Sequence, residues 1–99
     1  MTPLEEMDFR PGDVLSGFVT GRANPWHGST RKSVNRMISV EGFAGIYQEP
    51  PFGRLIWLYR TDGAASKARR MTKAAGLSNP SRLTRFVITD DLLPQEVDQ

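Results

Sequence analysis

The sequence contains no cysteine, and this absence excludes several kinds of chemistry at once. Without thiols the chain can form no disulfide, no thiolate nucleophile and no thiolate metal site. A protein that uses no disulfides suits the reducing cytoplasm, so we expect a cytoplasmic location. The first residues hold no basic segment followed by an apolar stretch, so we predict no signal peptide.

Histidine is nearly absent, and long apolar runs are missing altogether. His27 is the only histidine, no Gly-x-Ser-x-Gly motif accompanies it, and a zinc site needs three or four ligands. The acids Asp90 and Asp91 are adjacent and fit a turn better than a general acid–base pair. No run approaches the ~20 apolar residues of a membrane helix. We therefore expect no catalytic residues, no metal, no cofactor and no membrane partner.

The length and composition are those of one globular unit. The chain has 99 residues, of which 38% are hydrophobic and 24% are charged. A chain of this size buries roughly two-thirds of the surface that it exposes when unfolded, enough for one core. We predict a single domain over residues 1–99, with an N-terminal arm at 1–12 and an acidic tail at 90–99.

The net charge of +2 conceals blocks of one sign. Residues 1–13 hold four acids and one base, and residues 14–40 hold four bases and no acid. Residues 54–85 hold eight bases and one acid, whereas residues 86–99 hold four acids and no base. These blocks favour a surface with two faces of opposite sign, and the alternative is a fold that mixes the charges.

Alternating apolar residues and turn signals predict the strands. We expect strands over 13–20, 34–41, 43–48, 54–60 and 82–89, the second and third being one kinked strand at Gly42 or a tight hairpin. The strand at 54–60 is apolar on both faces, which indicates a central position in the sheet. Residues 21–33 show no apolar periodicity and predict a long loop.

One helix is expected, from about Asp62 to Ala75. Thr61 or Asp62 can cap its start, and Gly76 followed by Leu77 has the form of a Schellman stop. A stripe of mostly small residues, beginning at Ala64, should face the sheet. The predicted fold is therefore α+β, a two-layer sandwich with a four- to five-stranded sheet and one main helix, in the order β-β-β-α-β.

Two stretches could carry a binding surface. Trp26 lies in the predicted loop with Arg22, Arg31 and Lys32, a mixture typical of interface hot spots and also able to stack a base and contact phosphates. The alternative is that Trp26 folds back and covers the sheet. The predicted helix carries four cations, which could extend to Arg54, Arg60, Arg82 and Arg85 or could simply be a solvated face. The candidate partner-binding residues are Arg22, Trp26, His27, Arg31, Lys32, Lys67, Arg69, Arg70 and Lys73.

In size and composition the chain resembles the small accessory proteins of phages and mobile elements, including anti-CRISPR inhibitors. The likeness rests on a short, cysteine-free α+β chain with a basic half and an acidic tail, and it assigns no site residues. The missing catalytic groups, the loop that holds Trp26 and the blocks of opposite charge predict a non-enzymatic protein-binding module, an inhibitor or accessory protein that acts by steric or electrostatic blockade of a partner with an acidic surface. A nucleic-acid-binding protein that uses the same basic patch is the alternative, and a metal-assisted hydrolase is a third class. The sequence leaves the oligomeric state open.

Overall fold

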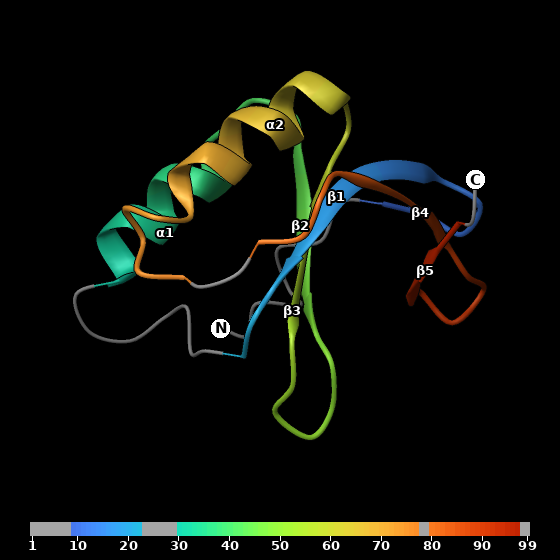
Figure 1. The fold of residues 1–99 in the computed structure, drawn as a ribbon. Coiled ribbons are helices and arrows are strands. Elements are labelled where there is room, and N and C mark those ends of the chain that lie inside the picture. Colours follow the sequence, from blue (N-terminus) through green and yellow to red (C-terminus); the bar gives the residue numbers. More distant parts are fainter. Residues whose placement is uncertain (1–8, 23–29, 78–79, 98–99) are drawn as a thin grey trace.

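The structure is a computed structural model that describes residues 9–22, 30–77 and 80–97. Its elements are, in chain order, β1 (Val14–Thr20), α1 (Thr30–Ile38), β2 (Phe43–Gln48), β3 (Leu55–Tyr59), α2 (Asp62–Met71), β4 (Thr84–Ile88) and β5 (Pro94–Glu96). Figure 1 shows both helices on the same side of the sheet. The predicted fold class is confirmed, since the chain forms an α+β unit with a five-stranded sheet covered on one face by helix.

The sheet is antiparallel throughout and has the strand order β2-β3-β1-β4-β5. The first six elements follow the βαββαβ order of interlocked split βαβ units, and β5 adds an edge strand beside β4. This connectivity supports many unrelated functions, so the fold alone assigns none.

The segment after the first strand differs from its prediction. We expected a loop to residue 33 and a strand over 34–41, and the chain instead forms α1 from Thr30 to Ile38. The alternation of Val34, Ile38 and Val40 suggested the strand, but it placed Arg36 on the same apolar face. In the helix Val34 and Met37 lie three residues apart and are both fully buried, while Arg36 is exposed.

The predicted start of α2 is confirmed, whereas its predicted end at Ala75 lies beyond the observed end of the regular helix. The Ala64 amide donates to the Thr61 hydroxyl over 3.1 Å, which makes Thr61 the N-cap. The regular helix ends at Met71 and continues as turns to Gly76, which has a φ of +71°. The Leu77 amide donates to the Thr72 carbonyl over 3.0 Å, which is the closing bond of a Schellman motif.

Apolar side chains are buried on both faces of the sheet. On the helix side, Phe18 of β1 stacks with Trp57 and Tyr59 of β3, with ring centroids 6.3 and 6.2 Å away. The Trp57 indole donates to Thr20 Oγ1 over 3.0 Å, and the Tyr59 hydroxyl donates to the Met37 carbonyl over 2.9 Å. Burial raises the pKa of Tyr59 far above its usual value. The aromatic side chains of β1 and β3 therefore belong to the interior.

The opposite face of the sheet carries a second apolar cluster, which draws on four strands. Its buried members are Leu15, Ala44, Ile56, Leu58, Phe86 and Ile88. Because β1 and β3 contribute to this cluster and to the one under the helices, the same backbone joins both halves of the core.

Part of the predicted acidic tail is structured. Residues 94–96 pair with β4 as the short strand β5, and Asp90 and Asp91 are exposed in the turn that precedes it. The predicted arm at 1–12 falls mostly outside the described residues, of which only 9–12 belong to it. Over the same described part of the chain, neither helix has the length and apolar character of a membrane span.

Candidate binding surface on the helices

The two helices pack side by side and run in opposite directions. The Ser33 hydroxyl, in α1, donates to the Ala74 carbonyl just after α2 over 3.3 Å. At the other end, a Cβ added at Gly42, after α1, would lie 3.1 Å from the Ala64 Cβ in α2. Figure 1 shows the resulting helical layer along one side of the sheet. Outward-facing residues of both helices therefore share one surface.

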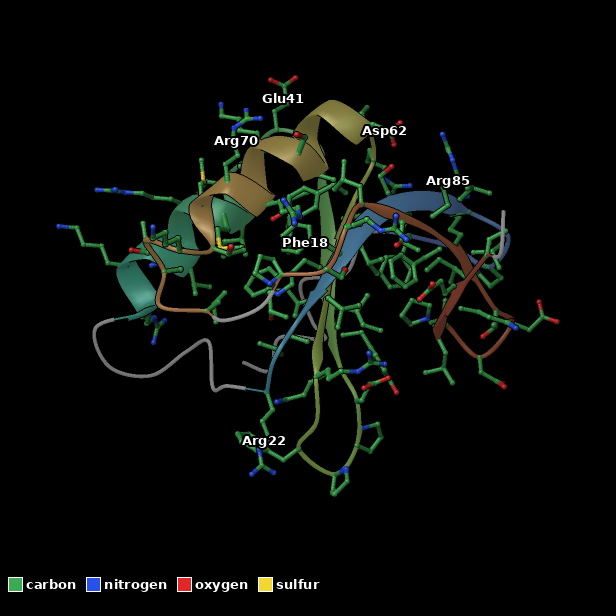
Figure 2. The ribbon with its side chains drawn as sticks, in the orientation of Figure 1. Phe18, Arg22, Glu41, Asp62, Arg70 and Arg85 are labelled. Carbon is green, nitrogen blue, oxygen red and sulfur yellow. The ribbon has the colours of Figure 1, made fainter. Side chains whose placement is uncertain are left out.

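This surface is rich in exposed cations, and we call it the helical basic face. It consists of Arg31, Lys32, Arg36, Lys67, Arg70 and Lys73. Within the described ranges none of these side chains forms an ion pair with a carboxylate. Among the residues that the structure describes, Arg70 donates only to the hydroxyl of Ser66, one turn earlier, over 3.2 Å, and Figure 2 shows its side chain on the outer side of α2.

Two groups of predicted binding residues meet on this face. Arg31 and Lys32 come from the first turn of α1, and they join cations that belong to α2 and the turn after it. Arg36 was not among the predicted residues, because the expected strand gave it no place beside α2. The helical spacing of Val34 and Met37 is the signal that could have found it, since it leaves Arg36 pointing outward.

Two exposed acids interrupt the positive charge where α2 begins. Glu41 lies in the connection between α1 and β2, and Asp62 is the first residue of α2 (Figure 2). Glu41 and Lys67 both line a shallow hollow of about 410 Å³ at this end of the helical layer. The surface is therefore basic along most of its length and mixed in charge at one end.

Arg69 was predicted to bind a partner, but its side chain has an internal role. Its Nε donates to the Ser81 carbonyl over 2.6 Å, and its Nη2 donates to the Pro80 carbonyl over 3.3 Å. The side chain is half-buried and ties α2 to the segment that leads into β4. Arg69 therefore contributes to the fold and does not belong to the helical basic face.

Two arginines that flank β3 and could have extended the basic surface are paired with acids elsewhere. Arg54 makes two hydrogen bonds, of 2.8 and 3.0 Å, to the carboxylate of Glu49, and they lower the pKa of Glu49. Arg60 donates to Asp13 over 3.0 Å. The predicted patch therefore does not continue from the helices through these two residues.

The remaining candidates lie apart from this surface or outside the described residues. Arg22 is exposed just beyond the end of β1, and Figure 2 shows it far from Arg70. Trp26 and His27 lie in the stretch 23–29, which the structure does not describe, so their proposed roles stay predictions.

The ranges that the structure describes hold no group of three or more histidine, aspartate or glutamate side chains that could bind a metal ion. Comparisons with protein-family models, with curated proteins and with solved structures find no match to this chain.

Proposed function

We propose that this protein is a non-enzymatic binding module that docks against an acidic protein surface through the helical basic face. In this role it acts as an inhibitor or accessory protein that blocks its partner sterically or electrostatically, in the cytoplasm. The observation that carries the proposal is the gathering of six exposed cations on two packed helices and the turn after α2, without a carboxylate paired to any of them in the described ranges. Such a surface attracts a partner of opposite sign.

The anchoring of the helical layer supports this role. Val34 and Met37 hold α1 in the core, and Ala65 and Ala68 hold α2, all four being fully buried. The cations therefore project from backbone that is already ordered, and binding need not fix the helices at an entropic cost.

Two features favour a protein partner over a nucleic acid. Glu41, which is exposed beside Lys67, would repel a uniformly negative phosphate backbone, whereas a protein can place a cation opposite it. In addition, the aromatic side chains of β1 and β3 are buried beneath the helices, so they cannot form the stacking platform that some sheets offer to single-stranded RNA.

The proposal is tested by capturing the partner and then measuring its affinity with purified proteins. Replacing Arg36, Arg70 and Lys73 together by glutamine should weaken binding about tenfold or more, since an exposed charge pair contributes roughly 0.5–1 kcal/mol. The matched control replaces Arg10, Arg82 and Arg85, three exposed cations outside this face, by glutamine. Equal affinity of the triple variant and the wild type would contradict the proposal.

A nucleic-acid partner would give a different result in the same assay. Duplex DNA or single-stranded RNA would then be retained at low salt, and log K would fall with log salt by about 0.9 for each phosphate contacted on duplex DNA. If the wild type retains the nucleic acid and the triple variant does not, the partner of the helical basic face is a nucleic acid and not a protein.

A further inference from the structure

A second polar hollow lies where the helical layer ends and the outer strands begin. It has a volume of about 560 Å³ and is lined by residues of β1, the start of α2, the segment 82–85 and the end of β5. This volume is within the range of small-molecule sites, about 300–1,000 Å³. The hollow is separate from the helical basic face, because no residue of that face lines it.

Hydrogen-bond donors converge on one carboxylate at this hollow. The hydroxyl of Ser16, which is 4% exposed, donates to Oδ1 of Asp62. Arg85 Nη2 lies 3.6 Å from Oδ2 of the same carboxylate, and Figure 2 shows the two side chains as neighbours. Asp62 therefore marks a position at which the surrounding groups already accommodate an oxyanion.

The hollow also has donor capacity that the protein does not use. Arg82 is exposed, and its guanidinium has no hydrogen bond or ion pair to any described residue. Its backbone carbonyl accepts from the hydroxyls of Ser81 and Thr84, which fixes the chain at this point. Arg85 is 53% exposed, and its guanidinium has, among the described residues, only the long contact with Asp62, so most of its five N–H donors remain available.

We propose that this hollow binds a small molecule through an oxyanion, a phosphate monoester or a carboxylate, held by Arg82 and Arg85. Guanidinium groups bind both oxyanions through paired hydrogen bonds. The Asp62 carboxylate, 63% exposed, competes with the ligand for Arg85. Leu83 and Val97, each 38% exposed, offer apolar contacts to the rest of the ligand.

The test is a titration of the protein with inorganic phosphate and, separately, with acetate, followed by backbone amide NMR shifts. Saturable shifts of the amides of Ser16, Arg82 and Arg85 are expected. The anion that binds with the lower Kd, phosphate or acetate, identifies the kind of oxyanion that the hollow prefers. Arg82→Gln and Arg85→Gln should each weaken binding about fivefold. Asp62→Asn should strengthen it by a similar factor, because it removes one of the two carboxylates, Asp62 and Glu96, that line the hollow, and the one that contacts Arg85.

The arginine variants should lower the affinity and Asp62→Asn should raise it, a pattern that a general loss of structure would not produce. Arg22→Gln, which removes an exposed cation away from the hollow, is the control and should leave the affinity unchanged. Arg82 is exposed and has no partner among the described residues, so the Arg82→Gln variant should fold normally. It therefore tests the proposal even if the Asp62→Asn variant does not fold. Absence of saturable shifts in both titrations, unchanged affinity in Arg82→Gln, or shifts confined to the helical basic face would overturn the proposal.

Discussion

Asp13 shows how a single surface carboxylate is held by both backbone and side-chain donors. The Arg10 amide donates to its Oδ2 over 2.9 Å, and Arg60 donates to the same atom over 3.0 Å. The Arg10 amide is the larger cause and Arg60 the second, and together they lower the pKa of Asp13 below its ordinary value of 3.8. Both donors favour the charged carboxylate, and the fold supplies them only in the native state.

This pKa shift predicts how stability depends on pH. Because the pKa of Asp13 is lowered in the folded state, its contribution is complete above the ordinary value and is lost as the pH falls through the lowered one. Urea midpoints measured from pH 5 to pH 2 should fall less steeply for Asp13→Asn than for the wild type. Identical slopes would show that Asp13 has the same pKa in both states.

Two glycines should respond to alanine in opposite ways. A Cβ at Gly17, in β1, would overlap the carbonyl oxygen of Trp57, so Gly17→Ala should destabilise the protein by about 1–3 kcal/mol. A Cβ at Gly63, in the first turn of α2, meets nothing within 4 Å, so Gly63→Ala should stabilise it by about 0.4–1 kcal/mol. Chemical denaturation measures both, and a stabilising Gly17→Ala would contradict the strand packing.

At the scale of elements, strands β1 to β4 and helix α2 could be predicted because local signals agreed with the final fold. Thr61 marks the start of α2, and Gly76 marks the end of the turns that follow it, through chemistry that a sequence displays directly. Helix α1 could not be assigned with the same ease, because Val34, Met37 and Ile38 fit helical spacing while Val34, Ile38 and Val40 fit alternation. Only packing against α2 and the sheet decides between them.

The candidate surface could be predicted only in part, for a related reason. A sequence displays the charge of an arginine but not its partner, so Arg69 and Arg70 look equivalent although one holds backbone carbonyls and the other is exposed. Strand β5 could not be predicted either, since Pro94, Gln95 and Glu96 show no alternation of apolar residues. They form a strand only because the free edge of β4 is available for pairing.

Helix α1 can be tested with two proline substitutions at exposed positions. Arg31→Pro lies in the first turn, where proline is tolerated, and should cost little stability. Asn35→Pro lies in the interior of the helix and should cost about 3 kcal/mol. Thermal unfolding followed by circular dichroism measures both, and equal effects would contradict the helix.

For the whole molecule, the two apolar clusters should unfold together. They lie on opposite faces of one sheet and share the strands β1 and β3. In a Trp26→Phe variant the remaining tryptophan, Trp57, reports on the helix-side cluster, since the sequence holds two tryptophans. Its fluorescence and the far-ultraviolet circular dichroism should give coincident transitions, and two separated transitions would indicate independent units.

The arrangement of charge also bears on the speed of association. Figure 1 shows the two helices and the β4–β5 turn, which holds the exposed Asp90 and Asp91, toward opposite sides of a molecule whose longest extent is 35 Å. If the proposed acidic partner docks on the helical basic face, the separation of charge should orient the two molecules within the ~8 Å over which charges act at physiological salt. The association rate should then fall as salt is added, while the dissociation rate of that complex should change little.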